Sequence, residues 1–217
     1  MATTAITTGA ADAPSVPMAS AIGSPKYEQL LTTALRLFYR DGYHAVGIDT
    51  VLAEAGVAKM TLYNHFPSKT DLIVAVLARQ AARLGAERTV LIEAAGADPA
   101  ARFAALFAWL EQWFRSPEFN GCAFIRAVAE FPAAESPVNR TVVAYRLRFL
   151  DLLERLVADL RVAKPRTVAE QILLLTEGAI VVAHTFRDPL AARRARQAAA
   201  AVVAAAAPAG SAARRRK

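Results

Sequence analysis

A short run of side chains near residue 60 has the chemistry to contact a polyanion. Lys59 can pair with a phosphate, Thr61 and Asn64 can hydrogen-bond to base edges or backbone oxygens, and Tyr63 adds a rigid ring with a hydroxyl. Lys69 opens the next predicted helix, where free backbone N–H groups already favour an anion. The candidate DNA contacts are Ala58, Lys59, Met60, Thr61, Tyr63, Asn64, His65 and Lys69.

Short helices with strong end signals are predicted to position these side chains. Ser24 and Pro25 form an N-cap and first-turn pair, and Gly42 ends the helix that they begin. Gly56 can adopt the positive φ that a tight turn between two further helices needs. The predicted helices span residues 25–41, 48–55 and 58–65.

The apolar residues of this region can share one small core, which leaves the candidate contacts on the outside. That core would contain Leu35, Phe38, Val51, Leu52, Ala55, Val57, Leu62 and Phe66. Two short helices joined by a turn and supported by a third match the helix-turn-helix arrangement, which places its second helix in the major groove. A small helical domain with merely solvated polar residues has the same spacing, so spacing alone leaves both interpretations open.

The string DTVLAEAGVAKMTLYNHFPSKTDL at residues 49–72 closely resembles the tetracycline-repressor (TetR) family of bacterial regulators. The resemblance covers about residues 26–72, with weaker similarity at 121–124 and 130–132. It implies a recognition helix from Ala58 to Asn64, with Lys59, Thr61 and Tyr63 touching DNA and Lys69 clamping a phosphate.

This chain departs from the family pattern at three positions. Gly47 stands where many members have Thr or Ser, and Ala58 stands where they often have Ser. Met60 occupies a position often held by a small residue, and it could touch a thymine methyl. Weaker helix capping and altered base contacts are therefore expected.

The rest of the chain is also predicted to be helical, because β-branched alternation is scarce and helix formers dominate. We expect an all-α protein: a three-helix DNA-binding domain, then a larger helical ligand-binding and dimerisation domain. A long helix is predicted from about residue 69 to the region of 85–93, and further helices at about 99–115, 122–130, 138–161, 166–185 and 189–206. The expected divisions are a disordered arm (1–23), the helix-turn-helix domain (24–70), the effector and dimerisation domain (71–206) and a basic disordered tail (207–217).

Net charge gives little support to DNA binding, although the formal charge is +7. Residues 1–186 contain 18 Lys or Arg and 18 Asp or Glu, so the excess lies entirely from Arg187 onward. The basic end of the chain is interpreted as a solvated extension rather than a nucleic-acid contact.

Large rings concentrate in the middle of the chain, where eight of the 17 aromatic residues lie between Phe103 and Phe131. Most are expected to be ordinary core, but such a bundle can also enclose an apolar pocket with a few polar groups. The family resemblance implies a pocket in which a small molecule changes the spacing of two DNA-reading heads. The predicted lining is Phe103, Phe107, Trp109, Trp113, Phe124, Glu130, Glu177 and His184, for a hydrophobic or aromatic effector.

The helices predicted at 166–185 and 189–206 are apolar on more than one face, as expected for packing inside a subunit and across a dimer. The family implies a four-helix interface from this pair, and therefore a homodimer on a palindromic operator.

The segment from Ile172 to Phe186 is interrupted by Glu177 and His184 and falls short of the roughly 20 residues of a membrane span. A bacterial cytoplasmic, nucleoid-associated protein without a membrane partner is predicted.

No pattern of residues indicates catalysis, a metal or a cofactor. The histidines lie far from any cluster with metal-ligand spacing, and no nucleophile–base pair or glycine-rich phosphate loop is evident. Cys122, the single cysteine, is either a buried inert thiol or an oxidant sensor at a helix start. The leading hypothesis is a homodimeric repressor released by a ligand; a helical ligand-binding or scaffold protein without operator binding comes second, and an enzyme last.

Overall fold

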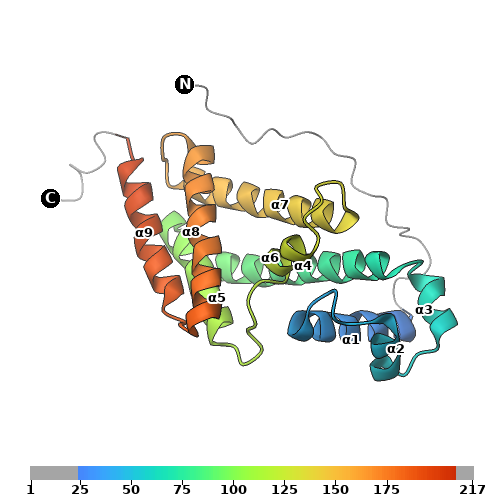
Figure 1. The fold of residues 1–217 in the computed structure, drawn as a ribbon. Coiled ribbons are helices and arrows are strands. Elements are labelled where there is room, and N and C mark those ends of the chain that lie inside the picture. Colours follow the sequence, from blue (N-terminus) through green and yellow to red (C-terminus); the bar gives the residue numbers. More distant parts are fainter. Residues whose placement is uncertain (1–23, 209–217) are drawn as a thin grey trace.

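A computed structural model describes residues 24–208, and within that range the chain forms α-helices and no strand (Figure 1). The predicted all-α fold is confirmed. The predicted arm at 1–23 and most of the predicted tail, 209–217, lie outside the described residues. The helices are α1 (Pro25–Asp41), α2 (Ile48–Ala55), α3 (Lys59–His65), α4 (Lys69–Ala94), α5 (Pro99–Arg115), α6 (Ala123–Glu130), α7 (Pro137–Asp159), α8 (Pro165–Phe186) and α9 (Ala191–Ala205).

The first three helices form a small unit around a core of their own. α1 packs on α2, α3 and α4. Val51 and Leu62 are fully buried in this core, together with Leu37 and Phe38. Leu35, expected in the core, is only partly buried, because Leu37 lies on the inward face of α1 instead.

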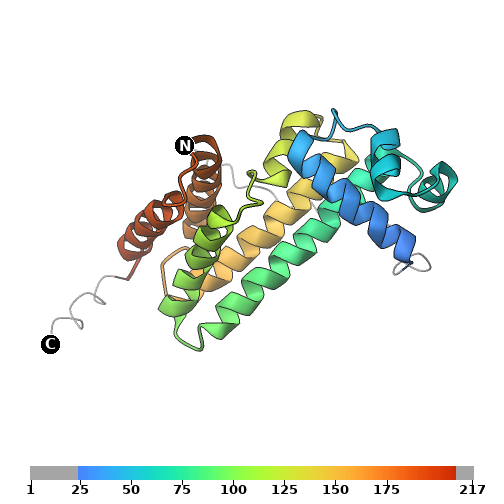
Figure 2. The ribbon, with the colours of Figure 1, turned by 90° about the horizontal axis from the view of Figure 1, so that it is seen from below.

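α4 connects this unit to the rest of the molecule as one continuous helix. It contacts α1, where Arg79 pairs with Glu28, and it also packs against α5 and α7. Figure 2 shows α4 and α7 side by side, running away from α1–α3 toward the far end of the bundle. A domain boundary near residue 70 would fall in the first turn of α4, so movement of this helix would reach both parts.

α8 and α9 lie together at the end of the molecule remote from α3 (Figure 1). α8 has 22 residues and is long and apolar enough to cross a membrane. Core helices of folded proteins can have the same length and hydropathy. It packs against α7 and α9. Its remaining face exposes Leu174, Val181 and Phe186.

Candidate nucleic-acid interface and effector pocket

The turn between α2 and α3 is built on Gly56. This residue adopts the left-handed conformation with φ 59° and ψ 37°. Its neighbour Val57 donates its backbone N–H to the carbonyl of Leu52 at 3.2 Å and is itself buried. A left-handed glycine followed by a buried residue directs the chain straight into α3.

One face of α3 is buried and the other is free. Leu62 is completely buried beneath the helix, whereas Met60 is 71% exposed and Tyr63 is 39% exposed. Lys59 and Asn64 are also exposed, and Thr61 is partly buried. An exposed methionine beside an exposed tyrosine, a lysine and an asparagine makes a surface suited to the edges of bases and to phosphates.

The ammonium of Lys59 has only a weak partner. Its Nζ lies 3.4 Å from Oδ1 of Asp49, and both side chains are well exposed. Exposed pairs of this kind contribute about 0–1 kcal/mol. Lys59 can therefore exchange Asp49 for a phosphate at little cost.

His65 and Lys69 differ from the other candidate contacts, because both side chains are partly engaged within the protein. The ring of His65 packs edge-on against Tyr27 with centroids 5.6 Å apart. Lys69 donates from Nζ to the carbonyl of His44 at 3.3 Å, and burial lowers the pKa of its ammonium. Both residues border the α3 surface rather than forming its centre.

The expected weakness in capping is present at α2 and α3. Ser24 and Ser68 accept hydrogen bonds from the first turns of α1 and α4, but Gly47 and Ala58 provide no side-chain cap to α2 and α3. α3 has only seven residues, so one uncapped end affects a large part of it.

Ala58→Ser is therefore expected to stabilise the protein by about 1 kcal/mol, because the hydroxyl can accept an N–H of the first turn of α3. Ala58 already has the extended conformation of an N-cap, with φ −68° and ψ 147°. Urea unfolding followed by circular dichroism measures the change. Ala53→Ser, on the exposed face of α2, is the matched control and should not stabilise.

Glu130, at the end of α6, joins the helical bundle to the helix-turn-helix unit. Its carboxylate accepts the backbone N–H groups of Tyr43 at 3.0 Å and His44 at 2.6 Å, in the connection between α1 and α2. The ring of His44 also contacts the carbonyl of Glu130 at 2.8 Å and lies 4.6 Å from the ring of Phe131. Glu130 thus anchors the helix-turn-helix unit.

Further hydrogen bonds hold the beginning of α6 against the end of α1. Tyr39 donates its hydroxyl to the carbonyl of Gly121 and accepts the N–H of Asn120, both at 2.8 Å. Tyr43 donates its hydroxyl to the carbonyl of Ala123 at 3.0 Å, and burial raises the pKa of that phenol. Both ends of α6 are therefore bonded to the helix-turn-helix unit.

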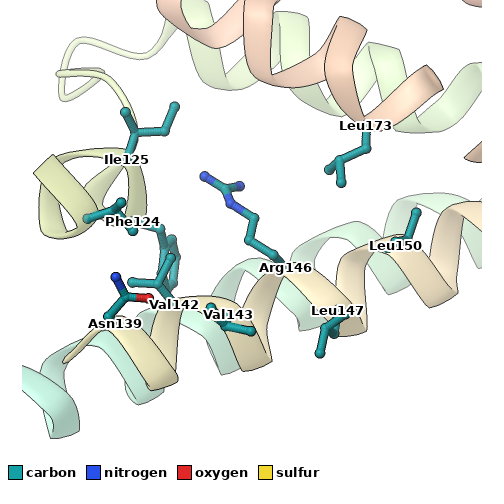
Figure 3. A pocket seen from close by; sticks show the side chains of 10 residues that line it. Phe124, Ile125, Asn139, Val142, Val143, Arg146, Leu147, Leu150 and Leu173 are labelled. Atoms are coloured by element: carbon teal, nitrogen blue, oxygen red, sulfur yellow. The ribbon is translucent and has the colours of Figure 1, made fainter. Parts of the chain in front are cut away.

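A pocket of about 430 Å³ opens between α6, α7 and α8 (Figure 3). Its walls are mainly aliphatic, and Arg146 extends between them. The lining comprises Phe124, Ile125, Val128, Asn139, Val142, Val143, Arg146, Leu147, Leu150 and Leu173.

Of the eight residues predicted to line an effector pocket, only Phe124 lines this one. Phe103, Phe107 and Trp109 are buried in the core, where Trp113 stacks on Trp109 with ring centroids 5.5 Å apart. His184 packs against Gly121, and Glu177 pairs with Arg146. The structure thus distributes the predicted set among core, domain junction and pocket wall.

The lining missed by sequence reasoning comes largely from α7. Val142, Arg146 and Leu150 follow one another at intervals of one helical turn, which is also the pattern of an ordinary core face. Arg146 is the residue in that apolar row that could have indicated a pocket, because a charge on a core face requires a partner or a ligand.

Arg146 has two partners beside the pocket. Its Nη1 pairs with Glu177, and its Nη2 lies 3.6 Å from Sγ of Cys122. Burial raises the pKa of Glu177 despite the cation beside it. Burial also raises the pKa of the Cys122 thiol, and Arg146 only partly opposes this, so the protonated thiol is favoured over the thiolate.

A second arginine, Arg88 on α4, is buried without a carboxylate partner among residues 24–208. Its Nη1 donates to the hydroxyl of Tyr145 at 3.0 Å, while its Nε has no hydrogen-bond partner within the described residues. The guanidinium lies 5.3 Å from the ring centre of Trp109 and 4.6 Å from that of Phe149. Aromatic faces supply part of the stabilisation that an acidic partner would give.

Two family models match the chain. Residues 30–76 match the model described as bacterial regulatory proteins, tetR family, and residues 99–199 match the tetracyclin repressor-like C-terminal domain. Among solved structures, a TetR-family transcriptional regulator from Streptomyces coelicolor superposes with a TM-score of 0.78 and 35% identity, covering 84% of this chain and 90% of that one. Reduced NemR of E. coli has the same fold, with a TM-score of 0.70 and 23% identity over 82% of this chain and 95% of its own.

Curated relatives match over a short part of the chain. The HTH-type transcriptional activator FasR of Mycolicibacterium smegmatis is 51% identical over 51 residues, which are 24% of this chain and 23% of FasR. The HTH-type transcriptional repressor KstR of Mycobacterium tuberculosis is 38% identical over 72 residues, 33% of this chain and 32% of KstR. The matched region thus spans only a quarter to a third of these two relatives.

Proposed function

The chain belongs to the TetR family of DNA-binding transcriptional regulators, and from this premise we propose that it is a homodimeric repressor released from a palindromic operator by a small hydrophobic effector. It is a regulator and not an enzyme. The observation that carries the proposal is the free face of α3, where Met60 and Tyr63 are exposed above a fully buried Leu62.

In the proposed complex, α3 lies in the major groove. Lys59 and Lys69 contact phosphates, Thr61, Tyr63 and Asn64 contact bases or backbone, and Met60 reads a thymine methyl. Ala58 and His65 border the contact at the two ends of α3. Because both ends of α6 bond to the helix-turn-helix unit and α6 also forms a pocket wall, a ligand there would shift α3.

The proposed dimer uses α8 and α9. Leu174 and Phe186 on α8 are 74% and 73% exposed, and a second copy would remove them from water. The two recognition helices would then read half-sites about 34–36 Å apart or somewhat more. A monomeric mass in solution at micromolar concentration would contradict this arrangement.

The protein is proposed to act at the bacterial nucleoid in the cytoplasm.

The test is selection of binding sites from a random duplex DNA pool, followed by electrophoretic shifts on the enriched site. We expect a palindrome, bound about tenfold less tightly by Tyr63→Ala because one base-reading contact is lost. Lys59→Ala should reduce the salt dependence of binding by about one phosphate contact. Val90→Ala, on an exposed position of α4, is the control and should bind normally.

Failure to enrich any sequence, even at low salt, would contradict operator binding. It would favour the second candidate, a helical ligand-binding or scaffold protein. A palindrome whose binding is unaffected by Tyr63→Ala would instead mean that α3 does not read it.

A further inference from the structure

Resting on the proposed ligand response, we propose that the pocket between α6, α7 and α8 takes an aliphatic acid, with its hydrocarbon body on the α7 wall and its single anionic group on Arg146. This narrows the effector from any hydrophobic or aromatic molecule to an amphipathic anion.

The shape and chemistry of the walls favour an aliphatic body. The pocket volume of about 430 Å³ is within the range that holds small ligands. Branched aliphatic side chains from all three helices form most of the surface, including Ile125, Leu150 and Leu173 (Figure 3). Among the described lining residues Phe124 is the only ring, and its face already stacks on Tyr145 at 3.7 Å, so little aromatic surface remains for a planar ligand.

The polar groups of the pocket favour an anionic head. Besides Arg146, the one other polar side chain in the described lining is Asn139, whose amide nitrogen donates to the carbonyl of Phe131 at 3.3 Å. Arg146 extends from α7 into the space between α6 and α8 (Figure 3), and its side chain retains 20% exposure. A guanidinium in apolar surroundings forms strong, directed hydrogen bonds with a carboxylate.

The charge balance around Tyr145 points the same way. The guanidinium carbons of Arg88 and Arg146 lie 5.6 and 5.5 Å from its ring centre. Glu177 neutralises one of these cations, and within residues 24–208 no carboxylate pairs with Arg88. Arg88 is buried near Tyr145, outside the pocket lining, so the region behind Arg146 carries one uncompensated positive charge. Its field favours a ligand with one negative charge at Arg146 over a cation.

Calorimetric titration of the full chain with three probes of equal length, decanoate, decanol and decylamine, tests the proposal. Decanoate should bind at least about tenfold more tightly than decanol, and decylamine most weakly. Arg146→Gln should weaken decanoate binding roughly ten- to a hundredfold and leave decanol unchanged.

The direction in which Glu177→Gln changes decanoate affinity distinguishes a ligand-binding Arg146 from a purely structural one. The substitution removes the carboxylate that competes for Arg146, so decanoate should bind more tightly, whereas loss of a purely structural ion pair would weaken binding. The matched control is Arg166→Gln, which removes another ion pair between α7 and α8, to Asp151 and Glu154, outside the pocket lining. That variant should bind decanoate normally.

Equal affinity for decanoate and decanol, absence of decanoate binding, or weaker binding by Glu177→Gln would each overturn the proposal. Operator shifts on the same preparations separate this result from the proposed function. A protein that binds its operator but no decanoate retains the DNA-binding function and loses the inferred ligand. A protein that binds decanoate as expected but no DNA retains the inferred ligand and loses the DNA-binding function.

Discussion

Glu130→Gln is expected to lower the free energy of unfolding by about 3 kcal/mol, because one of two charge-assisted hydrogen bonds across the domain junction is lost and the other loses its charge. The carboxylate accepts the N–H groups of Tyr43 and His44 with separate oxygens. A glutamine has one acceptor oxygen, and its amide N–H₂ would face a backbone donor. Urea unfolding of the full chain measures the loss.

The control is Glu135→Gln, five residues further along, whose exposed side chain makes no hydrogen bond or ion pair among the described residues. It should change stability by less than about 0.5 kcal/mol. A similar small change for Glu130→Gln would mean that the junction does not depend on this carboxylate. In that case the link from α6 to the helix-turn-helix unit would rest on Tyr39 and Tyr43.

Helix boundaries were accessible from the sequence because helix ends depend on local chemistry. Ser24-Pro25, Asp98-Pro99 and Ser136-Pro137 each combine a capping side chain with a proline in the first turn, and α1, α5 and α7 begin at those prolines. The turn at Gly56 was accessible for the same reason. The outward face of α3 followed from these boundaries together with the position of Leu62.

The pocket and the domain junction depend on contacts between distant residues, which no local pattern specifies. Glu130 bonds to residues 86 and 87 positions earlier, and Arg146 pairs with a residue 31 positions later. The concentration of aromatic residues suggested a pocket around Trp109 and Trp113, but these two rings stack on each other. Trp113 also borders a second cavity of about 300 Å³ beside α1 and α4, while the larger pocket lies between the aliphatic side chains of α6, α7 and α8.

Gly42 has one role that local sequence reveals and another that depends on tertiary contacts. Its role as the end of α1 was evident from its position after a helical run, and its N–H does bond to the carbonyl of Phe38 at 3.0 Å. Its second role is tertiary: a Cβ built at this position would lie only 3.0 Å from Oε1 of Glu130. The glycine therefore both ends the helix and admits the carboxylate that anchors α6.

Gly42→Ala is accordingly expected to lower the free energy of unfolding by about 3 to 4 kcal/mol. With φ 98° and ψ 162°, the backbone lies in a region that is essentially restricted to glycine, which accounts for about 1–3 kcal/mol. Displacement of the Glu130 carboxylate from its two N–H donors adds the remainder, about 1–2 kcal/mol. Gly96→Ala is the matched control, because Gly96 also has positive φ, 77°, but no atom within 4 Å of an added Cβ.

A double-mutant cycle separates the two contributions. In a Glu130→Ala background the carboxylate is absent, so Gly42→Ala should become less destabilising by about 1 kcal/mol, while Gly96→Ala should be unchanged. Urea unfolding of the single and double variants measures the coupling. Strict additivity between positions 42 and 130, with equal losses at Gly42 and Gly96, would show that backbone strain alone explains the glycine. A positive coupling would place the close approach of α6 and the α1–α2 connection among the contacts that hold the DNA-reading unit in position.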